Sequence, residues 1–136
     1  EIIIFEGWCV GAKPQRKKYL KKSINILEKN RDKNLIWRSR VNYELQNEYA
    51  SIFNKINRLI FLRVPSFKCV YKWRLLQEKK LQLTSRGKKI MSPTQVKSFI
   101  MYYERITKQM LVDLTKKAYA VLYLDKKHRF NKIKIN

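Results

Sequence analysis

The sequence has few of the residues on which several classes of protein depend. Among its 136 residues are two cysteines, Cys9 and Cys69, without a CxxC pair, and one histidine, His128. These counts argue against a disulfide framework, a zinc cluster and a serine–histidine–aspartate triad, and they favour a reduced, cytoplasmic protein. No apolar run approaches the roughly 20 residues that cross a bilayer, and no signal-peptide pattern is present, so we expect no membrane association.

Acidic residues are also scarce. The 10 Asp and Glu residues stand against 32 Lys and Arg residues, which gives a formal net charge of +22. Such an excess suggests a polyanionic partner such as nucleic acid. The basic residues, however, form short clusters scattered along the chain, and lysine, asparagine and isoleucine are abundant, as a biased genome composition would produce. Both interpretations stay open.

Hydrophobic residues make up 45% of the sequence, enough for the core of one domain. Their spacing predicts an alternation of strands and helices, which is typical of an α/β fold. The predicted elements are a buried strand over 2–5, a loop over 7–22, a helix over 41–56, a strand over 58–64, a helix after Ser66, a basic loop over 83–92, a helix that begins after Ser92 with Pro93 in its first turn, a strand over 118–124 and a basic tail.

The chain begins with Glu inside a strand pattern, and three strands are few for a doubly wound sheet. We therefore expect residues 1–136 to be the carboxyl-terminal part of a larger domain.

The stretch FEGWCVG at 5–11 carries the first candidate site. Glu6 follows the predicted strand, and ligands of open α/β sheets collect at the carboxyl ends of strands. A carboxylate there can hold Mg²⁺ or take a proton from an attacking hydroxyl, while Gly7 lets the backbone approach a substrate. A strand that ends in Glu-Gly is also an ordinary turn.

FEGWCVGAKPQ at 5–15 resembles the corresponding strand of the uridine kinase and phosphoribulokinase group of P-loop kinases. The longer match is to the D-glycerate 3-kinase family, through blocks at 35–67, 73–81 (WRLLQEKKL), 91–107 and 124–130 (LDKKHRF). This resemblance implies a three-layer P-loop NTPase-like fold with a parallel sheet, incomplete here at the N-terminus, and an ATP- and Mg²⁺-dependent kinase acting on a small molecule such as glycerate. The family's GxxxxGK[ST] loop is absent from the sequence, so we expect this chain alone to be inactive.

The resemblance also implies roles for single residues. It makes 66–92 a lid region in which Arg74 closes over the phosphates, because a guanidinium pairs bidentately with phosphate oxygens. It places Lys13 and Gln15 near an anionic acceptor and His128 near the nucleotide. For each the plain alternative is a solvated or packed side chain.

Four further residues have weaker signals. Gln77 and Glu78 are expected at the surface or at a lid hinge. Tyr103 is expected in the core, and Arg105 beside an acid.

Two functions follow from the sequence. The first is a glycerate-kinase-like phosphotransferase, of which this chain is a part. The alternative is a nonenzymatic, basic nucleic-acid-binding module, which would place aromatic residues on exposed faces lined by Lys and Arg. Phe53, Phe99 and Tyr103 fall on apolar helical faces instead, which favours the kinase. The oligomeric state has no signal in the sequence.

Overall fold

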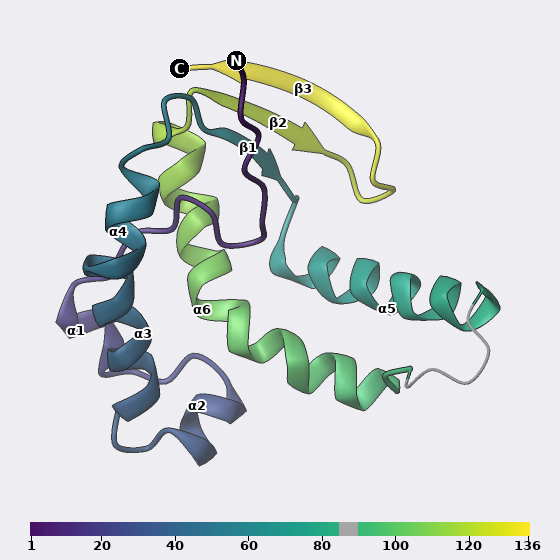
Figure 1. Ribbon diagram of the computed structural model, residues 1–136. Coiled ribbons are helices and arrows are strands. Elements are labelled where there is room, and N and C mark those ends of the chain that lie inside the picture. The colour runs from purple at the N-terminus through teal and green to yellow at the C-terminus, as the bar shows by residue number, and fades with distance from the viewer. Residues whose placement is uncertain (85–89) are drawn as a thin grey trace.

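The computed structural model describes residues 1–84 and 90–136 (Figure 1). The elements in these ranges are α1 (Lys17–Leu20), α2 (Ile26–Arg31), α3 (Ile36–Gln46), α4 (Glu48–Phe53), β1 (Ile60–Arg63), α5 (Phe67–Thr84), α6 (Pro93–Lys117), β2 (Ala120–Leu124) and β3 (Phe130–Ile135). The predicted basic loop over 83–92 lies in part outside the described residues. Within the described ranges, no helix is both long enough and apolar enough to span a bilayer.

The three strands form one mixed sheet in the order β1-β2-β3. β1 and β2 are parallel, with Ile60 opposite Ala120, whereas β2 and β3 are antiparallel, with Leu122 opposite Ile133. The predicted α/β class is confirmed, with a sheet that is parallel in part. Because β1 and β2 run in the same direction, their carboxyl ends meet at one edge of the sheet, where α5 begins and the β2–β3 turn lies (Figure 1).

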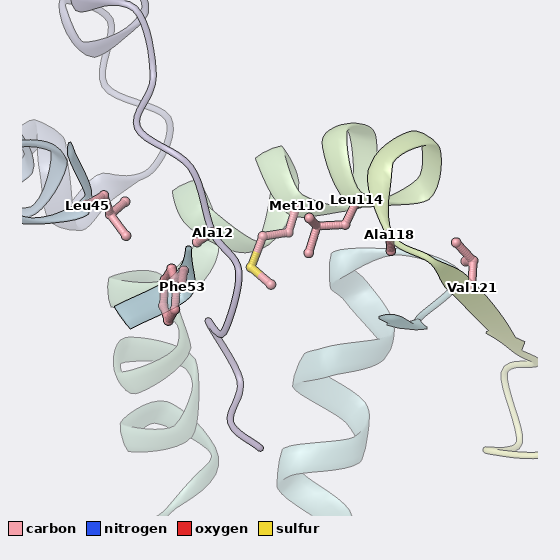
Figure 2. Close-up of a cluster of buried hydrophobic side chains, with 7 residues drawn as sticks. All are labelled: Ala12, Leu45, Phe53, Met110, Leu114, Ala118 and Val121. Atoms are coloured by element: carbon pink, nitrogen blue, oxygen red, sulfur yellow. The ribbon is translucent and has the colours of Figure 1, made fainter. Parts of the chain in front are cut away.

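Helix α6 is the central element of the packing. It begins as the sequence predicts: the Ser92 hydroxyl accepts from Gln95 N–H at 3.3 Å, and Ser92 N–H donates to the Gln95 side chain at 2.8 Å. Its apolar face supplies Met110 and Leu114 to the core shown in Figure 2. The remaining members of this core are Ala12, Leu45, Phe53, Ala118 and Val121.

The helix predicted over 41–56 is divided into α3 and α4. The division falls at Asn47, whose φ of −113° and ψ of −87° are not helical. The Asn47 side chain donates to the carbonyl of Tyr43 at 2.8 Å, which is the local competition by which asparagine interrupts helices. Of the predicted apolar face, Leu45 and Phe53 are buried, while Val41, Tyr49 and Ile52 are exposed.

The predicted strand over Ile2–Phe5 is wrong for the described chain. These residues form no strand, and Ile2 is 90% exposed. A strand requires a neighbour that pairs with its backbone groups, and no described residue pairs with this segment. The β-branched residues of this segment therefore indicate a propensity for strand, but the segment forms no strand in the described structure.

The basic tail, by contrast, forms β3. Asp125 orders the turn that precedes it: its carboxylate accepts from Lys127 N–H at 2.7 Å and from Arg129 N–H at 2.9 Å. The side chains of β3 are exposed, and Lys132 and Lys134 lie on this edge strand, where lysine discourages pairing with another chain. The hydrophobic pattern of the sequence did not predict this strand, because several of its residues are charged.

The helices of the described residues lie on one side of the sheet (Figure 1). Phe61 and Val121 face the helices, whereas Ile60, Leu62, Ile133 and Ile135 on the opposite face are exposed. The described residues thus supply no helix to that opposite face, which a three-layer arrangement requires. The short helices α1 and α2 fall within regions that the sequence left as connections.

Candidate functional site

The loop that follows Glu6 is held against α6 by Trp8. The Trp8 indole N–H donates to the hydroxyl of Thr107 at 2.9 Å, and its ring stacks on Tyr103 with centroids 4.6 Å apart and planes 13° apart. Thr107 is buried, so this hydrogen bond satisfies a polar group in a largely apolar setting. Glu6 and Gly7 are exposed at the start of this loop.

The next part of the loop turns sharply into the core. Gly11 has a φ of +78°, a value that favours glycine, and Ala12 is only 2% exposed. A Cβ atom on Gly11 would lie 2.7 Å from Leu59 Cδ2. The backbone therefore passes close to the segment before β1 at a point where a side chain has no room.

The end of the loop is held between two helices. The Asn42 side chain in α3 accepts from Gln15 N–H at 2.6 Å and donates to the Gln15 carbonyl at 3.1 Å. Arg105 in α6 donates to the Gln15 side-chain oxygen at 3.2 Å. Gln15 is thus ordered on both sides, while Lys13 is exposed and has no ion pair among the described residues.

Arg105 is itself part of a buried charge cluster. Its guanidinium pairs with Glu28, which also lies 3.9 Å from Arg38. Burial by itself raises the pKa of Glu28, but hydrogen bonds from Arg105 and from Ile24 N–H, with the charges of both arginines, outweigh burial and lower that pKa below its ordinary value. The expectation that Arg105 pairs with an acid agrees with this arrangement.

Arg74 lies on α5, and its side chain is fixed by contacts with three neighbouring side chains. Its guanidinium pairs with Glu78, donates to Gln77 at 3.3 Å, and lies 5.6 Å from the ring centroid of Phe99. Glu78 is 3% exposed and also accepts from Met91 N–H at 2.9 Å. The expectation of a surface position is therefore wrong for Glu78, whose carboxylate binds both Arg74 and the segment before α6, whereas Gln77 is exposed as expected. Their place at a lid hinge stays a prediction.

His128 lies in the β2–β3 turn, where its φ of +65° is unusual for a residue other than glycine. Its ring contacts Trp73, with centroids 3.7 Å apart, and Trp73 also donates to the carbonyl of Lys126 at 3.3 Å. The turn after β2 is therefore attached to α5 at the residue next to Arg74. His128 is exposed, and its contact with Trp73 is explained by packing of the two rings alone.

Two aromatic residues of α6 lie between the Glu6 loop and Arg74, and so connect these predicted parts of the site. Phe99 and Tyr103 are adjacent, with ring centroids 5.3 Å apart. Trp8 from the Glu6 loop stacks at one end of this aromatic pair, and Arg74 from α5 lies over the other end. His128 approaches from the sheet edge through Trp73. Lys13 and Gln15 lie farther along the loop, at the junction with α3.

A metal site is not assembled by the described residues alone. They contain no cluster of three or more His, Cys, Asp or Glu side chains in ligating positions. Glu6 offers a single exposed carboxylate. Kinase Mg²⁺ commonly uses one or two carboxylates and completes its octahedron with phosphate oxygens and water, so Glu6 fits part of such a site only.

Comparison with known proteins agrees with this architecture. The chain is 36% identical over 102 residues to the uncharacterized kinase mug58 of Schizosaccharomyces pombe, a match that covers 74% of this chain and 35% of that protein. Its whole length superposes on 50% of the D-glycerate 3-kinase of Cryptococcus neoformans var. grubii, with a TM-score of 0.78 and 19% identity. The chain has a glycerate-kinase-like fold.

The resemblance to glycerate-kinase-like P-loop kinases is thereby confirmed. No protein-family model matches the chain. The chain spans about a third of the length of the curated kinase and half of the length of the solved structure with the glycerate-kinase-like fold.

Several residues that shape the site were not predicted. Trp8 lies in the FEGWCVG motif and Asn42 in the helix predicted over 41–56, and neither had a predicted role. Glu28 had no signal in the sequence and Glu78 was expected at an exposed or hinge position, because a single acid on a short or amphipathic helix is ordinarily exposed. The scarcity of acids could have indicated their burial. In a chain with 10 acidic and 32 basic residues, many cations can neutralise each buried carboxylate.

Proposed function

We propose that residues 1–136 are the carboxyl-terminal part of an ATP-dependent, P-loop kinase that transfers a phosphoryl group to a hydroxyl of a small acid such as glycerate. The observation that carries this proposal is the superposition of the whole chain on half of a D-glycerate 3-kinase, supported by identity to a second kinase. The remaining part of the domain supplies the phosphate-binding loop, and the protein acts in the cytoplasm.

In this proposal Glu6 stands at the reacting end of the site. It is exposed, and the turn behind it is held rigidly by Trp8 and Gly11. Its carboxylate accepts the proton of the attacking hydroxyl, or contributes one ligand, directly or through water, to Mg²⁺. Bound with ATP, that ion would neutralise charge on the phosphates. Gly7 leaves space for the acceptor beside the backbone.

Arg74 serves as the cation of the lid. Glu78 holds one side of its guanidinium, and the planar fork retains further N–H groups for phosphate oxygens, whose charge changes during transfer. Lys13 and Gln15 bind the carboxylate of the acceptor, with Gln15 positioned by Arg105. His128 contacts the nucleotide from the β2–β3 turn, beside Trp73.

The test uses the complete product of the gene that carries these residues. We expect transfer of labelled γ-phosphate from ATP to glycerate, analysed across a panel of small hydroxy acids. Glu6→Gln is expected to lower kcat by about 100-fold or more, because it removes a group acting on the transferred proton. Arg74→Ala is expected to lower kcat by about 1,000-fold.

Glu48→Gln is the matched control for Glu6, because Glu48 is an exposed acid on α4. It should leave kcat within about twofold, as a surface substitution distant from the chemistry would. Failure of every hydroxy acid to accept phosphate from ATP would overturn the kinase proposal. Full activity in Glu6→Gln would overturn the role of Glu6.

A further inference from the structure

Residues 13–40, which we call the basic lobe, have a surface charge of almost one sign. They include α1, α2 and the first half of α3, which lie together away from the sheet (Figure 1). Its exposed cations are Lys13, Arg16, Lys17, Lys18, Lys21, Lys22, Lys29, Arg31, Lys33 and Arg40. Its acids are Glu28 and Asp32, and each is only 8% exposed.

The two acids are used inside the basic lobe. Asp32 pairs with the buried Arg38 at 3.2 Å, and Glu28 pairs with Arg105 at 2.6 Å. Because both carboxylates are buried and neutralised internally, they do not offset the exposed lysines. Within the described residues, Arg40 is the one exposed cation of the lobe with an ion pair, to Glu44.

Hydrogen bonds from two arginines, Arg38 and Arg105, hold the segments of the lobe together. The Arg38 guanidinium donates to the carbonyl of Leu20 at 2.8 Å and to that of Asp32 at 2.9 Å. Arg105 donates to the carbonyls of Tyr19 at 3.0 Å and Lys22 at 2.7 Å. The segment that carries Lys17 to Lys22 is thereby held beside the α2–α3 connection, so the cations belong to one ordered surface rather than to a loose tail.

Aromatic side chains are exposed on the same surface. Trp37 is 68% exposed and Tyr19 is 55% exposed. Trp37 borders an open hollow of about 220 Å³, smaller than the roughly 300 Å³ and more of typical ligand pockets, which suits one planar ring. Side chains that share this hollow include Asn30, Arg31, Lys33 and Asn34, which provide amide groups and positive charge.

We propose that the basic lobe binds single-stranded nucleic acid. Its cations contact phosphates, and Trp37 stacks on a base that occupies the hollow, with Asn30 and Asn34 near the edges of that base. Cations along a backbone path combined with exposed aromatic rings are the features of sequence-tolerant single-strand binding. The lobe shares Lys13 and Gln15 with the proposed acceptor loop, but the residues that carry this proposal, Lys17 to Lys22 and Trp37, have no role in the kinase assignment, so the proposal does not depend on it.

The lobe is less suited to a membrane surface. α1 and α2 have 4 and 6 residues, so neither offers the long apolar face with which basic amphipathic helices enter a bilayer. The exposed rings beside amide groups favour a partner with bases to stack. A vesicle measurement distinguishes the two partners.

The test measures binding of residues 1–136 to a fluorescein-labelled 20-nucleotide oligouridylate by anisotropy, between 50 and 200 mM KCl. Replacing Lys17, Lys18, Lys21 and Lys22 together by Gln is expected to weaken binding by at least about tenfold at 100 mM KCl. If all four contact phosphates, the slope of log K against log salt falls by about 3. Trp37→Ala is expected to weaken binding by about fivefold or more.

The matched control replaces Lys126, Lys127, Lys132 and Lys134 by Gln. These four exposed lysines lie in and beside β3, and their removal changes the net charge by the same amount. Binding by this control should change less than threefold. Circular dichroism verifies that each variant is folded.

Equal losses in the two lysine variants would overturn the proposal, because they would indicate attraction by net charge alone. Unchanged binding by Trp37→Ala would overturn the base-stacking role. Co-sedimentation with phosphatidylserine vesicles, without measurable binding to the oligonucleotide, would overturn the choice of partner.

Discussion

Arg105 of α6 and Glu28 of α2 form a bidentate ion pair in the interior of the helical region. Nε of Arg105 lies 2.7 Å from Oε1 of Glu28, and Nη2 lies 2.6 Å from Oε2. The same guanidinium also donates to Gln15, to Tyr19 and to Lys22. One side chain thus connects the proposed acceptor loop, the basic lobe and the central helix.

Arg105→Leu is expected to destabilise the protein by about 3–5 kcal/mol, because it leaves the Glu28 carboxylate buried without its main partner. The free energy of unfolding by urea, followed by circular dichroism, measures this. Arg40→Leu is the control, since its pair with Glu44 is at the surface and should contribute about 0–1 kcal/mol. Equal effects of the two substitutions would contradict the structural role of the buried pair.

Acid should weaken the fold through Glu28. Its pKa is lower in the folded chain than its ordinary value of 4.5, so the unfolded state binds the proton more readily. The stabilisation is therefore fully present above about pH 4.5 and is lost as the pH falls through the lower, folded-state pKa. We expect the Tm to fall more steeply with acid in the natural chain than in Glu28→Gln. Parallel profiles below pH 4.5 would show that Glu28 contributes nothing.

Gly11→Ala is expected to destabilise the fold by about 1–3 kcal/mol. The φ of +78° is unfavourable for alanine, and its Cβ would lie 2.7 Å from Leu59. Gly7→Ala is the matched control, since its Cβ would meet Val10 at 3.1 Å and its φ is not in the left-handed region. Thermal unfolding compares the two. A Tm for Gly11→Ala equal to that of Gly7→Ala would show that the backbone at Gly11 relaxes without cost.

The thiol of Cys9 should be unreactive near neutral pH. Burial raises its pKa to about 11, so little of the nucleophilic thiolate is present at pH 8. In a Cys69→Ala background, alkylation of Cys9 by iodoacetamide, followed by mass spectrometry, should be slow at pH 8 and faster in urea. Rapid alkylation of the folded chain at pH 8 would show that the pKa of the partly buried Cys9 thiol is not raised.

The elements that the sequence predicts correctly are those with complete local signals. Ser92, Pro93 and Gln95 define the start of α6, because a capping box needs only residues close in the chain. β1 and β2 follow from short apolar runs with β-branched and aromatic residues. The predicted strand at Ile2–Phe5 fails for the described chain because a strand depends on a partner, which local composition does not provide.

The candidate site was predictable in part. Glu6, Gly7 and Arg74 were found through the resemblance and the chemistry of phosphoryl transfer, and their roles stay predictions. The supports around them were not found, since Trp8 contacts a threonine 99 positions later in the chain. The exposed aromatics that the nucleic-acid alternative requires were also missed, because Trp37 precedes the helix predicted over 41–56 and only the structure shows that it lies exposed on α3.

The sequence by itself determined the α/β alternation, the start of the central helix and the large positive charge, since propensity, capping and composition act within a few residues. Only the tertiary structure decided where that charge is exposed and left without acidic neighbours. Burial of Glu28 and Asp32 leaves the basic lobe positive at its surface, and pairing with β2 turns a lysine-rich tail into β3. Both outcomes depend on contacts between distant segments, whose free energy is set by the neighbours that folding brings together.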